Sequence, residues 1–319
     1  MMNLTLKQLR YFEALATHGH FGRAASACAI SQPALSLQIK ELEESLGIAL
    51  FERGPREVRL TSFGAEFALR VREIVQAVDE LGDLARASRD RLVGRLRIGV
   101  IPTIAPYLLP TLITRLSARN LDLHIRETVT PKLIEELKAG RIDTAIVALP
   151  VSEPSFAEVA LFTEPFVLVR PDRDAGAPVP DGEALQRMRL LLLEEGHCFR
   201  DQALSFCSMP SAVPRDGLDG SSLSTLVQMV GAGMGVTLVP EMALAVETRS
   251  AAVSVARFRP PEPERTIGMI WRKTSPLAQQ LSEIAELVGE AALALRVLRS
   301  QDDGQSVVAP PLPSLPDAG

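Results

Sequence analysis

The sequence predicts a small helical module with a β-ribbon, one long helix, and a larger α/β domain made of two doubly wound subdomains. Three observations support this prediction. Apolar residues recur at helical spacing near the N-terminus, a heptad-like seam follows them, and strand and helix signals alternate from about residue 94 onward. A chain of 319 residues is also long enough to form more than one domain.

Three short amphipathic helices are expected within residues 1–61. The first is capped by Thr5 and ends near Gly19, and the third is capped by Ser31 and ends at Gly47. The segment FERGPREVRLT then predicts two short extended pieces around a Gly-Pro turn. Two helices joined by a short turn and followed by a ribbon have the proportions of a winged helix-turn-helix domain.

The third helix is expected to present side chains that suit nucleic acid. Those placed for base edges in the major groove are Ser31, Gln32, Pro33, Ser36 and Gln38. Those suited to phosphates are Lys40 on this helix and Arg53, Arg56 and Arg59 in the ribbon. The net charge of −5 gives no overall attraction to nucleic acid, so DNA binding depends on these local features. Periodicity alone also fits a three-helix bundle with an ordinary solvated face.

Residues 62–90 predict a single long helix that links the two domains. Its apolar positions alternate four and three apart, as in a coiled coil, at Phe67, Val71, Ile74, Val78, Leu81 and Ala85. Such a seam has to be covered by another helix, and a second copy of the chain is the simplest source. The sequence therefore predicts dimerisation through this helix, with packing of the seam onto its own domain as the alternative.

Residues 91–300 show the alternating strand and helix pattern of an α/β domain. Strands are expected over LRIGVI, LHIRETV, DTAIVAL, FVLV, RLLLLE, GVTLVP and TIGMIW, and helices from Pro106, Pro131, Ser221 and Pro276. Residues 301–319 are rich in proline and small polar residues, so this tail is expected to be disordered.

Two of the three cysteines, Cys198 and Cys207, lie nine residues apart in GHCFRDQALSFC. His197 and Arg200 flank the first, and nearby cations raise the thiolate fraction of a cysteine and its reactivity toward peroxides. In one helix this spacing amounts to about 13.5 Å of rise and places the sulfurs on opposite faces. A disulfide would therefore require the segment to unwind, because bridging demands α-carbons within about 7 Å. Spacing alone also fits two ordinary core residues, and Cys28 falls on the inward face of its helix.

The segment FGRAASACAISQPALSLQIKELEESLGIALFER resembles the helix-turn-helix of LysR-type transcriptional regulators over nearly every position. The long helix and the α/β domain match the layout of that family, whose effector domain is periplasmic-binding-protein-like, so the resemblance covers about residues 3–300. It implies a homodimer or homotetramer that binds double-stranded promoter DNA and acts with RNA polymerase. It assigns Ser31, Gln32, Pro33, Ser36 and Gln38 to the reading helix and Arg53 to the wing.

The motif GHCFRDQ followed by FC resembles that of the hydrogen-peroxide sensors within this family. The resemblance implies that hydrogen peroxide oxidises Cys198 to a sulfenic acid, that Cys207 resolves it as a disulfide, and that the resulting change in conformation controls antioxidant genes. A thiol reductant of the glutaredoxin or thioredoxin type would reset the protein. The matching positions of the peroxide pocket are Thr103, Thr130, His197, Arg200, Asp201 and Gln202.

From the residues alone, Thr103 and Thr130 each follow a predicted strand and precede a helix. Ligands bind at such positions in doubly wound sheets, and helix capping is the alternative use of a threonine there.

Other classes of function are opposed by the composition. The apolar residues are dispersed, without a run near the roughly 18 that a membrane span requires. The N-terminus lacks the layout of a signal peptide, and so few cysteines indicate a reducing compartment, so a cytoplasmic protein is expected. The four histidines show no metal-ligand spacing. Neither a metal, a cofactor nor the catalytic residues of an enzyme are therefore expected.

Three alternatives remain open from the sequence. The first is a LysR-type regulator whose effector is a small metabolite bound between the two subdomains, with incidental cysteines. The second is a thiol peroxidase that uses Cys198 in turnover. The third is an exported solute-binding protein, which fits the second half of the chain alone and is opposed by the missing signal peptide.

Overall fold

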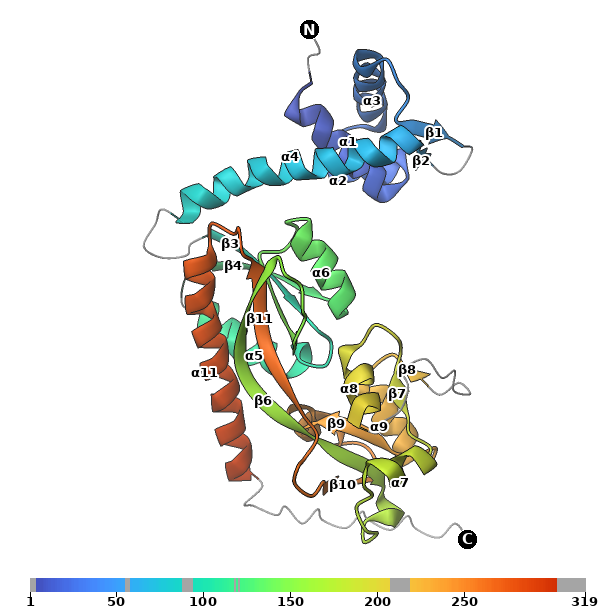
Figure 1. Cartoon of the computed structure of the whole chain (residues 1–319), viewed down its shortest axis with the longest axis vertical. Helices are drawn as coiled ribbons and strands as arrows, with labels where there is room; N and C mark the ends of the chain where they lie inside the picture. Colours follow the sequence, from blue (N-terminus) through green and yellow to red (C-terminus); the bar gives the residue numbers. More distant parts are fainter. Residues whose placement is uncertain are drawn as a thin grey trace, which may run out of the picture. The chain divides into compact units, whose positions relative to one another are not determined.

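The computed structural model describes residues 4–54, 58–87, 94–117, 119, 121–206 and 219–302. The chain forms two compact units (Figure 1). The first consists mainly of Met1–Arg91, and the second mainly of Leu92–Leu137, Ile142–Thr274 and Ala278–Gly319.

The first unit is a winged helix-turn-helix, as expected. Its elements are the helices α1 (Leu6–His18), α2 (Phe21–Ala27), α3 (Gln32–Leu46) and α4 (Ser62–Ala87), with an antiparallel wing of β1 (Phe51–Arg53) and β2 (Val58–Leu60). The expected caps are confirmed: the side chain of Thr5 accepts a hydrogen bond from the backbone of Gln8, and Gly19 and Gly47 end their helices in the left-handed conformation.

The core of this unit is built from the inward stripes of the three short helices. Phe12, Leu35 and Ile39 are fully buried in it. The ring of Phe12 lies 5.2 Å from that of Phe51 in the wing and 5.1 Å from that of Phe67 in α4. These contacts join the wing and the start of the long helix to the helix-turn-helix.

The predicted seam of α4 divides into two parts. Val71 is buried and Phe67 is partly buried against the core of the same unit, so these two positions pack on the chain's own helices. For this half of the seam the alternative holds, because the face that carries it is also the face that contacts α1. Ile74 and Leu81 further along are 48% and 63% exposed, so the described residues of the chain do not cover these two positions of the second half.

The second unit contains a seven-stranded mixed sheet with the order β10-β6-β11-β5-β3-β4, in which β9 also pairs with β6. What we call the first lobe holds the parallel strands β3 (Gly94–Val100), β4 (Leu121–Glu127) and β5 (Thr144–Leu149), and the crossover helices α5 (Ala105–Ser117) and α6 (Thr130–Lys138). It is completed by β11 (Glu264–Arg272), by the first part of β6 (Phe156–Pro171) and by α11 (Ala278–Asp302). Strand β11 lies between β5 and β6 and runs antiparallel to both.

What we call the second lobe forms around the last part of β6, which pairs with β9 (Thr237–Pro240) and β10 (Val253–Arg257). A parallel pair, β7 (Leu192–Leu193) and β8 (Asp219–Gly220), and the helices α7 (Gly182–Arg187), α8 (Cys198–Phe206), α9 (Leu223–Gly231) and α10 (Leu244–Glu247) complete it. Strand β6 therefore runs through both lobes (Figure 1).

The structure differs from the sequence-based expectation in several elements. Strand β10 and the helices α7 and α10 lie where the sequence predicts neither a strand nor a helix. The strand predicted over FVLV is the end of β6, which begins ten residues earlier at Phe156. Helix α11 continues to Asp302, two residues into the tail expected to be disordered, and the rest of that tail lies outside the described residues. In the part of the chain that the structure describes, none of the helices combines the length and apolar character needed to cross a bilayer.

The start of α4 lies unusually close to the wing, which makes Gly64 a test of the packing in the first unit. A Cβ atom at Gly64 would lie 2.0 Å from the carbonyl oxygen of Leu50, so Gly64→Ala forces backbone to move. We expect a loss of stability on the order of 1–3 kcal/mol, measured by thermal unfolding. Gly82→Ala in the same helix is the matched control, because no described residue outside the adjoining backbone of α4 lies within 4 Å of its new methyl group. Equal unfolding temperatures for the two variants would contradict the close approach.

Candidate functional site

Cys198 is the first residue of α8 and is partly buried. The chain reaches it through Gly196, whose φ of +92° suits a residue without a side chain. The first-turn amide groups of a helix lack intrahelical acceptors, so this end of α8 favours negative charge. The reduced segment is helical from Cys198 to Phe206, as expected, and Cys207 lies outside the described residues.

A narrow niche surrounds Cys198, with no space in this conformation for a molecule the size of water. It is lined by residues that follow β3, residues at the start of α6, and residues at the start of α8: Ile101, Pro102, Thr103, Val129, Thr130, His197, Cys198 and Phe199. The structure thus brings Thr103, Thr130 and His197 to the cysteine. Both threonines lie at the carboxyl ends of neighbouring parallel strands, which is the ligand-binding edge of such sheets.

Two polar atoms, one in the niche and one on α8, have no hydrogen-bond partner among the described residues. They are the hydroxyl oxygen of Thr130 and the side-chain carbonyl oxygen of Gln202, and both are buried. Gln202 lies four residues after Cys198 in α8 and therefore shares its helical face. A buried acceptor without a donor is unfavourable, so a small molecule that carries O–H groups would satisfy what the protein leaves open. The lack of a backbone partner also argues against helix capping by Thr130.

His197 and Arg200 were expected to act as cations that raise the thiolate fraction of Cys198, and the structure gives each a different environment. Burial lowers the pKa of His197, and Glu194 opposes this only in part, so the imidazole is neutral at pH 7. The guanidinium of Arg200 is buried and donates to the carbonyl of Leu193 and to the carboxylate of Asp219, both at 2.9 Å. Arg200 therefore serves to tie α8 to β7 and β8.

Asp201 is exposed on α8 and does not line the niche. Arg200 follows Cys198 by two residues in the helix and therefore points away from its face, whereas Asp201, three residues after Cys198, lies at the solvent-exposed edge of that face. Of the six predicted pocket positions, Arg200, Asp201 and Gln202 are not among the residues that line the niche in this conformation.

A buried ion pair behind the niche was missed by the sequence analysis. Arg265 donates from Nη1 to the hydroxyl oxygen of Thr103 at 2.8 Å, and from Nε and Nη2 to Glu164 at 2.9 and 2.7 Å. Both charged side chains are almost fully buried. A sequence feature could have indicated this pair. Glu164 in TEPFVLV and Arg265 in ERTIGMIW are charged residues that lie beside apolar strand segments.

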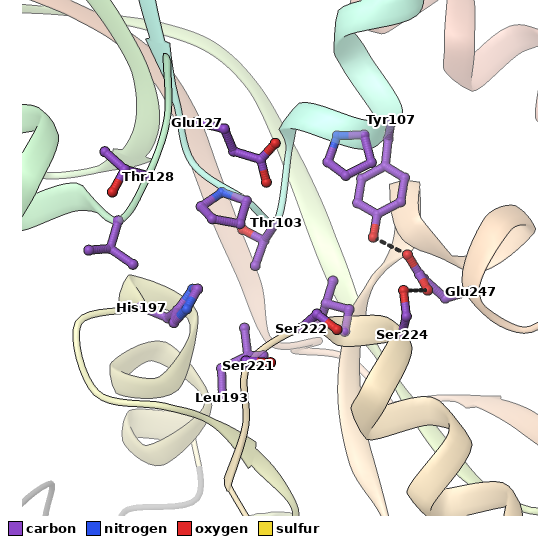
Figure 2. A pocket seen from close by; sticks show the side chains of 14 residues that line it. Thr103, Tyr107, Glu127, Thr128, Leu193, His197, Ser221, Ser222, Ser224 and Glu247 are labelled. Atoms are coloured by element: carbon purple, nitrogen blue, oxygen red, sulfur yellow. Dashed lines mark hydrogen bonds between the residues drawn. The ribbon is translucent and has the colours of Figure 1, made fainter. Parts of the chain in front are cut away.

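A larger cleft of about 310 Å³ adjoins the niche and shares Pro102, Thr103, Val129 and His197 with it (Figure 2). On its far side Glu247 accepts hydrogen bonds from Tyr107 and Ser224, both at 2.6 Å. Burial and the bond to Glu247 raise the pKa of Tyr107, which stays protonated. The cleft lies between residues of the two lobes and adjoins the niche at these shared residues.

The other cysteine of the described chain differs from Cys198. Cys28 ends α2 and packs against the core of the first unit, and burial raises the pKa of its thiol. Its thiol therefore stays protonated and unreactive. Among the described residues, no group of histidine, cysteine, aspartate and glutamate side chains is arranged to hold a metal ion.

The predicted DNA-reading residues lie on or beside α3. Gln32, Pro33 and Lys40 are exposed, and Ser36 and Gln38 are partly exposed. Ser31 caps the helix. The Nε2 atom of Gln38 donates to Oε2 of Glu41 at 2.7 Å, and the Nζ atom of Lys40 lies 3.5 Å from Oε1 of Glu44. In the wing Arg59 is exposed, the side chain of Arg53 is not described, and Arg56 lies outside the described residues.

Comparison with known proteins places this architecture in a family. The LysR substrate binding domain matches residues 89–293, and the bacterial regulatory helix-turn-helix protein of the lysR family matches residues 6–65. A probable hydrogen peroxide-inducible genes activator from Streptomyces viridosporus is 42% identical over 304 residues, which cover 92% of this chain and 97% of that protein.

Solved structures agree with this relationship. A cysteine variant of full-length OxyR from Pseudomonas aeruginosa is 36% identical with a TM-score of 0.70, covering 90% of this chain and 95% of its own. A cysteine mutant of Corynebacterium glutamicum OxyR with hydrogen peroxide bound is 33% identical with a TM-score of 0.63, covering 95% and 99%. The chain therefore belongs to the LysR family of bacterial helix-turn-helix regulators, within its OxyR group.

Proposed function

We propose that this chain is a DNA-binding transcriptional regulator that senses hydrogen peroxide through Cys198. The observation that carries the proposal is the niche, in which Thr103, Thr130 and His197 surround the cysteine and the buried hydroxyl oxygen of Thr130 has no partner among the described residues. A relative is named as a hydrogen peroxide-inducible activator, and a similar structure contains hydrogen peroxide. The comparisons do not favour the alternative of a metabolite effector.

In the proposed reaction the thiolate of Cys198 attacks one oxygen of hydrogen peroxide. An S–O bond forms as the O–O bond breaks, so the cysteine is oxidised by two electrons to a sulfenic acid. The peroxide is reduced to hydroxide, which takes a proton and leaves as water. The thiol of Cys207 then attacks the sulfenic sulfur, an S–S bond replaces the S–O bond, and a second water leaves.

The polar groups of the niche suit this reaction. The oxygen of Thr103 accepts from Arg265, so its own hydrogen is left to donate into the niche. The hydroxyl of Thr130 can either accept or donate a hydrogen bond. The side-chain carbonyl of Gln202, which shares the helical face of Cys198, is a further buried acceptor without a partner among the described residues. Neutral His197 offers one donor and one acceptor.

The proposed switch follows from the length of α8. A helix from Cys198 to Phe206 holds these two residues far apart, at about 1.5 Å of rise per residue, and Cys207 directly follows Phe206 in the sequence. Joining Cys198 to Cys207 would require α8 to unwind. A dithiol reductant of the glutaredoxin or thioredoxin type would return two electrons and restore the helix.

The remaining roles follow from the first unit. Residues 1–61 form the proposed DNA-binding domain, with α3 in the major groove and the arginines of the wing near phosphates. The exposed half of the seam in residues 62–90 would pair two chains, and residues 91–300 would report oxidation to them. The regulator would act with RNA polymerase on promoter DNA in the cytoplasm. One oxidation per signal suffices for a sensor, so enzymatic turnover is not part of the proposal.

Cys198→Ser tests the sensing thiol. The variant should lose peroxide-dependent promoter activation and should form no disulfide to Cys207, because its hydroxyl is not a nucleophile at neutral pH. Peptide mass spectrometry after a short peroxide pulse and a reporter assay measure both. Cys28→Ser is the control and should behave as the unaltered protein does, since this thiol is partly buried and protonated. Activation that persists in Cys198→Ser would refute the redox proposal while leaving DNA binding intact.

His197→Asn tests the neutral imidazole through the pH dependence of stability. Because the folded pKa lies below the ordinary value of 6.5, the unfolded chain binds more protons in that range, and stability should fall as pH decreases below about 6.5. The substitution removes this contribution, so the unfolding temperature should drop less between about pH 7 and pH 5.5 than it does in the unaltered protein. An unchanged slope would show that His197 titrates normally.

Leu81→Glu tests pairing through the exposed half of the seam. A charge at this position should weaken self-association, as measured by sedimentation equilibrium, because it would be buried against the partner helix. Leu69→Glu is the matched control: Leu69 is similarly exposed at 59% but lies on the opposite side of the heptad pattern. If both variants associate as strongly as the unaltered chain, pairing of two chains through this seam is excluded.

A further inference from the structure

Glu164 and Arg265 form a buried ion pair where β6 passes from the first lobe to the second. They are direct partners in the antiparallel register of β6 and β11. One carboxylate oxygen of Glu164 accepts both Nε and Nη2 of Arg265, and the two side chains are 3% and 0% exposed. Charges so deeply buried require full pairing, so the geometry of each depends on the other.

The same pair connects the thiol niche to the second lobe. Arg265 donates to the hydroxyl oxygen of Thr103 at 2.8 Å and to its carbonyl oxygen at 3.1 Å. The other carboxylate oxygen of Glu164 accepts from the backbone N–H of Met242 at 3.0 Å. Glu164 therefore fixes the guanidinium that holds Thr103, and it is itself fixed by the second lobe.

Ring contacts link the pair to Cys198 by a second path. The guanidinium carbon of Arg265 lies 5.9 Å from the centre of the Phe166 ring. Phe166 meets Phe199 edge to face with ring centres 5.2 Å apart, and Phe199 directly follows Cys198. The ion pair thus lies behind the niche and contacts it through Thr103 and through the aromatic pair.

Two consequences follow for chemistry at the niche. The hydrogen-bonded guanidinium fixes the Thr103 oxygen as an acceptor and so directs its hydrogen away from Arg265. The carboxylate of Glu164 also cancels the charge of Arg265 in surroundings of low dielectric. Without it, a buried cation one side chain away would favour the thiolate form of the cysteine.

We propose that Glu164 is a positioning residue for the reaction of Cys198 with hydrogen peroxide, acting through Arg265 on Thr103 and setting the charge behind the thiol. This inference rests on the proposed function. Among the described residues, the other charged or titratable groups around the cysteine are His197, Arg200 with its partner Asp219, Asp201, Glu194, Glu195 and, across the cleft, Glu127. They are unaltered in the variants below.

The test measures the rate of oxidation of Cys198 by hydrogen peroxide as a function of pH, using the full chain, quenched flow and peptide mass spectrometry. In Glu164→Gln the uncompensated guanidinium should shift the pH midpoint of the rate downward by about one unit. The loosened Thr103 should lower the rate at the high-pH plateau by about tenfold. Glu164→Asp keeps the charge but is too short to reach both partners, so it should lower the plateau and leave the midpoint in place.

Asp143→Asn is the matched control. Asp143 is buried and accepts from the backbone and side chain of Arg97 at 2.8 and 2.6 Å, but it does not line the niche. It reports the effect of breaking an ion pair in the same sheet, and it should retain both the plateau and the midpoint.

The outcomes separate this inference from the proposed function. If Cys198 of the unaltered chain reacts no faster than a free cysteine, the proposed function fails. If it reacts rapidly and Glu164→Gln has the same midpoint and plateau, the positioning role fails. Should Glu164→Gln not fold, Glu164→Asp decides: a lowered plateau with an unchanged midpoint supports the role, and an unaltered profile overturns it.

Discussion

The placement of one thiol at the junction of two lobes is the constraint on which the effector unit depends. Cys198 starts α8 in the second lobe, whereas Thr103 and Thr130 follow strands of the first. The niche therefore exists only while the lobes keep this arrangement. A chemical change at the sulfur that moves α8 must alter the fit between the lobes, so reaction and conformation are coupled by construction.

The arrangement is held by an ion pair that the strands themselves create. Strand β6 is long enough to serve both lobes, and its residue Glu164 faces Arg265 of β11 at the crossing point. A shorter strand would leave the guanidinium without its carboxylate. Burying two charges is costly, and hydrogen bonds offset this cost. Arg265 donates to Thr103 in the first lobe, and Glu164 accepts from the backbone N–H of Met242 in the second.

Local sequence signals predicted most helices and strands of the first unit and the parallel strands of the second. They did not predict which residues pair over long distances in the sequence. The cap at Thr5 and the end at Gly47 depend on neighbouring residues and were found. The start of β6 was missed because its residues from Ala157 to Thr163 are half-buried or exposed and are interrupted by Glu158, which gives no continuous apolar run. Arg265 was missed for a related reason: its role depends on Glu164, about a hundred residues away in the sequence. Asp201 was assigned by motif alone, and in the structure its side chain is exposed and does not line the niche.

The energy of unwinding α8 explains how one bond could drive a large change. Phe199, Ala203 and Leu204 are buried by this helix, and exposing a phenylalanine side chain alone costs about 1.5–3 kcal/mol. That cost keeps the reduced form helical, and a disulfide across the segment would have to exceed it. Because Phe199 packs on Phe166, which lies against Arg265, unwinding would also remove support from Thr103. The oxidised niche would then no longer be built for peroxide, so the proposed sensor would react once and wait for its reductant.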